Sequence, residues 1–166
     1  MAAGSTYEPI ATTTLGSTAA SYTFSSIPST YTDLILVVRA ALNAAGDIYV
    51  QFNGDTATNY SITTLYGTGS AAGSTRFSSQ TQALIAYYGN LTSTLGNTNQ
   101  IVQIQNYANT TTNKTFISRG NNAGSGLDAN VGLWRSTAAI NSIKLNNSST
   151  TFSVGSTFTL YGIAAA

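Results

Sequence analysis

The chain has 166 residues, of which only 7% are charged; its net charge is +1, and it contains no histidine and no cysteine. The length predicts one domain, and the missing side chains exclude Ser-His-Asp and Cys-His catalysis, zinc, haem or iron–sulfur ligation through His or Cys, and disulfides. Six scattered cations leave no electrostatic footprint for nucleic acid or for an anionic membrane surface.

Strands dominate the predicted secondary structure. Two prolines, few Lys or Glu, and abundant Thr, Tyr and Ile favour strands over helices. Clusters of Gly, Asn and Ser recur about every ten residues, a spacing typical of an all-β sandwich or barrel. We expect ten or eleven short strands in one domain. In chain order they span residues 7–15, 22–27, 33–42, 48–52, 60–66, 82–88, 100–107, 114–119, 131–135, 140–145 and 158–163.

Three of these strands carry specific expectations. The apolar run at 33–42 predicts a strand that is buried on both faces. The strand at 100–107 alternates, with Ile101 and Gln103 on one face and Val102 and Ile104 on the other. We expect it to pair with 114–119 in a meander.

The segments between the strands read as turns and loops. Residues 67–79, 89–99 and 120–128 are rich in Gly, Ser, Ala or Asn and are predicted as surface loops. Asn53-Gly54 is a strong turn signal, although the connection from 48–52 to 60–66 is longer than a two-residue hairpin. A short helical turn is predicted at 137–140. Residues 1–6 read as a flexible arm before a single sandwich domain at 7–166.

The acidic residues do not form a recognised catalytic motif. A glycosidase needs two carboxylates, and the chain offers Glu8, Asp33, Asp47, Asp55 and Asp128. Residues 55–59 place oxygen side chains at alternate positions, as calcium loops do, but a single carboxylate is little charge for a dication. We therefore predict structural roles in turns, no catalytic residue, no metal site and no cofactor.

Three arginines lie in or at the ends of apolar strands, where an unpaired charge is costly. These are Arg39, Arg119 and Arg135. The candidate counter-ions are Glu8, Asp33 and Asp55. We predict structural charge pairs among Asp33, Asp55, Arg119 and Arg135.

Several aromatic residues are candidates for a contact surface. Tyr66, Tyr87, Tyr88 and Trp134 are the plausible members of a sugar-stacking platform, with burial in the core as the alternative. Trp134 lies in an alternating run, which favours the core. Tyr87 and Tyr88 are adjacent on one strand and cannot both face inward, so one of them is expected to meet solvent or a partner. Tyr7, Tyr87 and Tyr88 are the predicted subunit or partner contacts.

The surface composition suits contact rather than chemistry. Thr, Ser, Asn and Gln account for 68 of the 166 residues. Soluble monomers usually keep a charged surface, because charge opposes association. A neutral hydrogen-bonding surface costs less to desolvate than ions do, and it therefore favours long-lived assemblies or glycan surfaces.

An ordered series of segments runs along the chain at residues 6–10, 24–34, 52–55, 132–140 and 156–163. These segments resemble those of tailed-phage virion proteins, which are frequent in cyanophages. The resemblance implies a virion structural protein of jelly-roll type, found either as a head decoration (cement) protein or as a tail-fibre or tailspike part. It implies no catalytic residues.

Composition and resemblance together lead to one functional expectation. We expect an antiparallel β-sandwich of jelly-roll type that decorates the outer surface of the phage head and stabilises contacts between major capsid proteins. Its expected partners are the major capsid protein and itself, as a homotrimer, without nucleic acid or membrane. No signal peptide is visible at the start, so synthesis in the host cytoplasm is expected. The alternative is a tail module that binds host cell-surface glycan.

Overall fold

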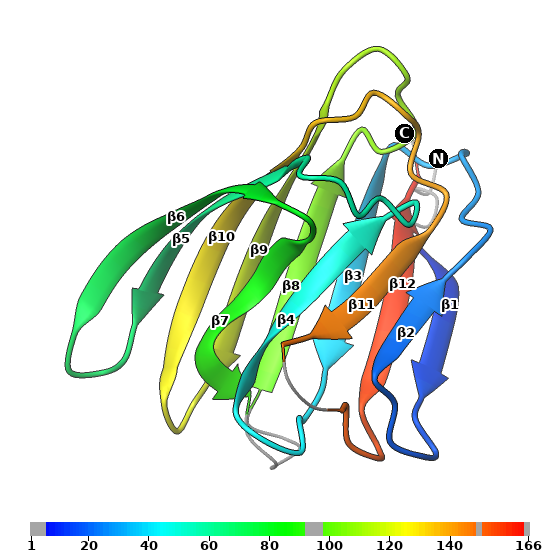
Figure 1. Ribbon diagram of the computed structural model, residues 1–166. Coiled ribbons are helices and arrows are strands. Elements are labelled where there is room, and N and C mark those ends of the chain that lie inside the picture. The colour runs from blue at the N-terminus through cyan, green and yellow to red at the C-terminus, as the bar shows by residue number, and fades with distance from the viewer. Residues whose placement is uncertain (1–5, 92–97, 149–150, 165–166) are drawn as a thin grey trace.

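The computed structural model describes residues 6–91, 98–148 and 151–164, and it is built from strands (Figure 1). The predicted arm at 1–6 therefore lies outside the described residues except for Thr6. No helix in the described part is long and apolar enough to cross a membrane. The strands are β1 (Tyr7–Thr14), β2 (Ser21–Phe24), β3 (Asp33–Arg39), β4 (Gly46–Phe52), β5 (Tyr60–Gly67), β6 (Ala72–Gln80), β7 (Ala83–Leu91), β8 (Thr98–Gln105), β9 (Lys114–Asn122), β10 (Gly126–Trp134), β11 (Ile143–Asn147) and β12 (Thr157–Ile163).

Two antiparallel sheets face each other in a sandwich. The larger sheet has the order β1-β12-β3-β8-β9-β10-β5-β6, and the smaller has the order β2-β11-β4-β7. The strands from β1 to β4 alternate between the sheets, and so do β7, β8, β11 and β12, which is the winding of a jelly roll. The hairpins β5–β6 and β9–β10 are inserted into this pattern, and both add their strands to the larger sheet (Figure 1). The predicted antiparallel β-sandwich is confirmed.

The core lies between the sheets and follows the alternation of the strands. On β3, the inward residues Leu34, Leu36 and Val38 are fully buried. Removing each such side chain from water contributes about 2 kcal/mol. The outward residues Ile35 and Val37 are only half-buried, so the prediction that this strand is buried on both faces is wrong.

Aromatic rings fill one end of the core at close range. Phe52 from the smaller sheet contacts Phe116 and Trp134 from the larger one, with ring centroids 6.0 and 5.5 Å apart. Gly132 makes this packing possible, because a Cβ at that position would lie 1.8 Å from the Phe116 ring. Trp134 is 2% exposed, which confirms its expected place in the core.

The pairing of β8 with β9 confirms the predicted meander. Val102 lies opposite Ser118 and Ile104 opposite Phe116, and all four side chains point inward. The outward residues of β8 include Ile101, as the alternation predicted.

Two predicted loops contain strand instead. Residues 67–79 include most of β6, which pairs with β5 through Thr64↔Thr75 and its neighbours. Residues 120–128 include the ends of β9 and β10, which are joined by a turn of three residues. The loop predicted at 89–99 is likewise shortened by the ends of β7 and β8. Backbone hydrogen bonds hold these segments in the sheet, and such bonds need no apolar side chains.

The other differences concern connections. Residues 137–140 form no helical turn. The Asn53-Gly54 turn does not close a hairpin, because β4 belongs to the smaller sheet and β5 to the larger. Asn53 has φ 54° and Gly54 has φ 68°, and these two left-handed residues turn the chain from one sheet to the other.

Candidate functional site

The larger sheet has one face that packs on the smaller sheet and one face that points away from it. We call the second the outward face. Its aliphatic side chains are unusually exposed: the exposed fraction is 59% for Leu65, 58% for Leu127 and Val131, and 51% for Ile117. Antiparallel sheets commonly present polar residues on the solvated side, so this face is unusual for a soluble sandwich.

The strand register gathers these side chains into a band that crosses the sheet. One row pairs Val37 with Ile101 and continues through Arg119 and Ala129 to Leu65. The next row continues from Ile35 through Gln103 and Ile117 to Val131. Directly paired residues on one face have Cβ atoms about 5 Å apart. The apolar band, as we name it, therefore consists of Ile35, Val37, Leu65, Ile101, Ile117 and Val131.

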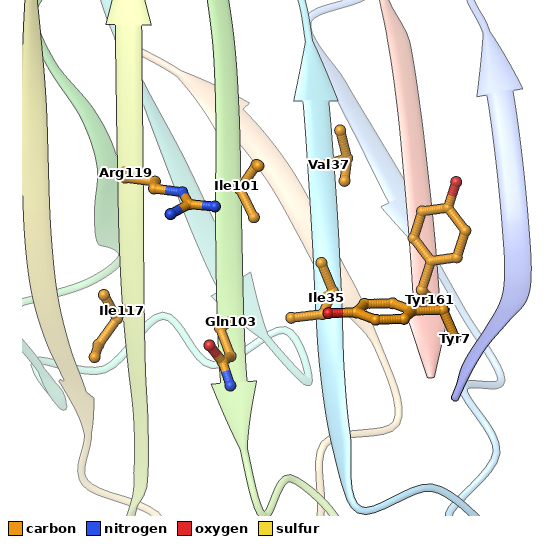
Figure 2. A pocket seen from close by; sticks show the side chains of 8 residues that line it. All are labelled: Tyr7, Ile35, Val37, Ile101, Gln103, Ile117, Arg119 and Tyr161. Carbon is orange, nitrogen blue, oxygen red and sulfur yellow. The ribbon is translucent and has the colours of Figure 1, made fainter. Parts of the chain in front are cut away.

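A shallow hollow of about 350 Å³ lies at one end of the apolar band (Figure 2). It is lined by Tyr7, Ile35, Val37, Ile101, Gln103, Ile117, Arg119 and Tyr161. The rings of Tyr7 and Tyr161 meet edge to face, with centroids 6.4 Å apart. In Figure 2 the Tyr7 ring reaches across β12 toward Ile35, and the Arg119 side chain extends toward Ile101. The hollow thus combines an aliphatic floor with two phenol rings, one amide and one guanidinium.

All four arginines of the chain belong to the outward face. Arg39 lies two residues after Val37 on β3 and therefore on the same face. Arg76 lies opposite Thr63, and Arg119 lies opposite Ile101. Arg135 directly follows β10 and donates to the Ser61 Oγ at 2.6 Å on the same face. Among the described residues, none of these guanidiniums forms an ion pair with a carboxylate.

The acidic side chains are engaged elsewhere. Asp33, at the rim of the outward face, accepts the backbone N–H of Asn106 at 2.7 Å. Asp47 accepts the Tyr49 hydroxyl at 3.3 Å. Burial and the nearby Glu8 carboxylate together raise the pKa of Tyr31. The predicted partners Asp33, Asp55, Arg119 and Arg135 are thus not brought together as ion pairs.

Asp55 organises the turn before β5. Its carboxylate accepts the backbone N–H of Ala57, the amide of Asn59 and the indole N–H of Trp134, at 2.9, 2.9 and 2.6 Å. Burial raises its pKa, but the hydrogen bonds from Asn59, Trp134 and Ala57 outweigh burial and hold the pKa of Asp55 below its usual value. The calcium-like spacing at 55–59 is therefore used for a turn, as expected.

Asp128 lies between the sheets among other polar side chains. It is 2% exposed and accepts the Tyr87 backbone N–H at 2.6 Å and the Asn130 amide at 3.2 Å. Burial raises the pKa of Asp128 despite these hydrogen bonds. The neighbouring Gln100 is fully buried, and its amide makes no hydrogen bond in the structure. In the described part of the chain no three acidic residues gather to hold a metal ion.

The predicted contact tyrosines have different surroundings. Tyr7 is 58% exposed at the hollow. Tyr87 is half-buried and packs edge to face against Tyr66 and Phe77, at centroid distances of 5.6 and 5.7 Å. Tyr88 lies on β7, but its side chain is outside the described residues. Of the two predicted contact tyrosines whose side chains the structure describes, Tyr7 lies on the outward face, where it meets Tyr161, which the sequence analysis did not single out.

The apolar band and the hollow were not predicted from the sequence. Their residues come from strands that are far apart in the chain. One signal was available: Ile35 and Val37 make the second face of the strand at 33–42 apolar, and this was interpreted as burial on both faces.

Comparisons with known proteins add little to this geometry. No protein-family model matches the chain, and no curated protein matches it either. Among solved structures, a crystal structure of exo-inulinase from Aspergillus awamori aligns with 12% identity and a TM-score of 0.34. The alignment covers 95% of this chain and 29% of that chain. A likeness this weak carries no argument about function.

Proposed function

We propose that this chain is a non-enzymatic structural protein of a bacteriophage virion. In this proposal it decorates the outer surface of the head, as a homotrimer, and stabilises contacts between major capsid proteins. The observation that carries the proposal is the outward face, where an apolar band is open to solvent on an otherwise neutral sandwich. Multiple copies of a modest contact add up to a stable shell through multivalency.

The position of the carboxylates supports a structural role. The hollow on the outward face is lined by no acidic residue. Asp55 and Asp128 are committed to hydrogen bonds within the fold. General acid–base chemistry at the hollow would therefore have to come from a tyrosine or the guanidinium, without a carboxylate beside it.

The copy number per particle tests the proposal. Gradient-purified virions of the phage that encodes the chain would be digested and quantified by mass spectrometry against the major capsid protein. We expect hundreds of copies per particle. A few to some tens of copies would place the chain on the tail, and its absence from the particles would refute a virion role.

A tail module that binds host glycan is the second candidate, and the hollow favours it. Tyr7 and Tyr161 offer ring faces or edges to a sugar, and Gln103 and Arg119 offer hydrogen-bond donors beside them. A glycan array would test this candidate. Specific binding that is lost in Tyr161→Ala, and kept in Tyr22→Ala on another part of the sandwich, would favour the tail module.

A further inference from the structure

We propose that the outward face docks on a protein surface that presents carboxylates around an apolar patch. This inference rests on the proposed function in one respect, because it specifies the chemistry of the subunit that this chain would bind.

The outward face has the composition of a protein-binding surface. Its centre is the apolar band, which Gln103 and Arg119 interrupt, and its surroundings include threonine, asparagine and the other three arginines. Interface centres are depleted in charged residues but enriched in Tyr and Arg, with a polar rim. The chain places all four of its arginines here, together with Tyr7 and Tyr161, while Lys114 is 1% exposed and Lys144 lies on the smaller sheet.

The charge of the face selects an acidic partner. Four guanidiniums share it with one described carboxylate, that of Asp33, which is already hydrogen-bonded to Asn106. Burying an arginine without a carboxylate is unfavourable, because the charge loses its hydration and gains no partner. A partner must therefore supply carboxylates. Two parallel hydrogen bonds between a carboxylate and a guanidinium make such a pair strong and specific.

A second copy of the same face does not meet this requirement. Face-to-face pairing would bury eight arginines against two aspartates. The carboxylates elsewhere on a copy already have neighbours within the fold: Asp55 accepts from Trp134 and its own turn, Asp47 accepts the Tyr49 hydroxyl, Asp128 is buried, and Glu8 lies near the Tyr31 hydroxyl. The partner is therefore a different protein.

The aliphatic content favours protein over an acidic polysaccharide or a nucleic acid. Leu65, Leu127, Val131 and Ile117 are each more than half exposed, and so is Tyr7. Exposed apolar side chains that gather on one face and have polar neighbours are typical of a protein-binding surface. A polyanion with little apolar surface would leave the band in water.

Nuclear magnetic resonance with model polymers tests the inference on the whole chain. The ¹⁵N-labelled protein would be titrated with a random glutamate–tyrosine copolymer, with polyglutamate and with alginate. The copolymer supplies carboxylates and apolar groups together, whereas the other two supply carboxylates alone. We expect the copolymer to bind at least tenfold more tightly than either, with shifts confined to the amides of the outward face.

Matched variants assign the binding to the face. Val131→Asp and Arg119→Ala should each weaken copolymer binding at least tenfold. Val154→Asp is the control for an exposed valine elsewhere, since Val154 is 53% exposed, and Lys144→Ala is the control for charge. Both controls should change the affinity less than twofold. The spectrum of each variant reports directly whether the fold is kept.

The contrary outcomes are distinct. Equal binding of polyglutamate and copolymer, or tighter binding of alginate, would overturn the inference in favour of a charge-driven or glycan ligand. No binding of any polymer would overturn it as well. Sedimentation of an oligomer whose contacts broaden the outward-face signals would replace it by self-association. Absence of the chain from virions would refute the proposed function but leave the copolymer result standing.

Discussion

At the scale of single residues, Gly132 and Phe116 define how closely the core packs. The Phe116 ring occupies the space where a Cβ of residue 132 would lie, at 1.8 Å. We expect Gly132→Ala to lower the free energy of unfolding by about 2–3 kcal/mol, because the ring must leave its place. Urea unfolding at pH 7 measures this. Gly16→Ala is the control, since a Cβ there meets nothing within 4 Å, and an equal loss in both variants would contradict the packing argument.

Asp55 is the second residue whose role is open to direct test. Asp55→Ala leaves the buried indole N–H of Trp134 without its acceptor, and we expect a loss of about 1–3 kcal/mol. The pKa of Asp55 is lower in the folded state, so its contribution is present above about pH 4 and is lost as pH falls through the folded pKa. Urea unfolding at pH 7 and pH 3 should therefore show a smaller difference between variant and wild type at pH 3. A difference independent of pH would contradict this.

Asp128 should change the free energy of unfolding with pH in the opposite direction to Asp55. Burial raises its pKa in the folded state, so stability is greatest below the unfolded value of about 4 and declines as pH rises through the folded pKa. Asp128→Asn removes this decline while its carbonyl still accepts the Tyr87 N–H. We expect the variant to gain stability over wild type between pH 4 and pH 7 in thermal unfolding. A variant less stable than wild type at pH 7 would show that the ionised carboxylate is favourable.

At the scale of elements, Asn53 joins the connections that cross between the sheets. Its side chain accepts the backbone N–H groups of Asn141 and Ser142, at 2.9 and 3.2 Å, and donates to the Ala139 carbonyl at 2.8 Å. Asn53→Gly keeps the left-handed backbone but loses these hydrogen bonds. Asn53→Ala loses the hydrogen bonds and also makes the left-handed backbone unfavourable. We expect both variants to be destabilised, by about 2–3 kcal/mol for glycine and more for alanine. Equal stability of wild type and Asn53→Gly in urea would show that the backbone alone matters.

The elements also show how far a single sequence predicts this fold. Strands with clear alternation were found: the strand predicted at 100–107 is β8, displaced by two residues, and its alternation was correct because the two faces of the sheet differ in burial. β6 was missed, since its one large apolar residue, Phe77, gives no periodic signal, and its place in the sheet depends on hydrogen bonds with β5. The candidate site was largely missed for a related reason: strand order brings Ile35 and Ile117 into one row, and no local pattern encodes that order.

At the scale of the whole molecule, the few charged side chains are unevenly distributed. The few cations that the chain has are not scattered over the sandwich, because its four arginines share the outward face with the apolar band. Glu8 and Asp47 lie on β1 and β4, and the other acids lie at a turn, at the rim or in the interior. One face of the molecule therefore combines exposed aliphatic side chains with the arginines, and the rest of the described surface carries few charges.

Cryo-electron microscopy of the intact virion tests the central claim most directly, because it locates the chain and shows which face is covered. We expect density for the sandwich on the outer surface of the head, with the outward face of the larger sheet against a neighbouring subunit and carboxylates of that subunit beside Arg119. Density on the head with that face toward solvent would contradict the docking surface. A particle without this density would contradict the virion role itself.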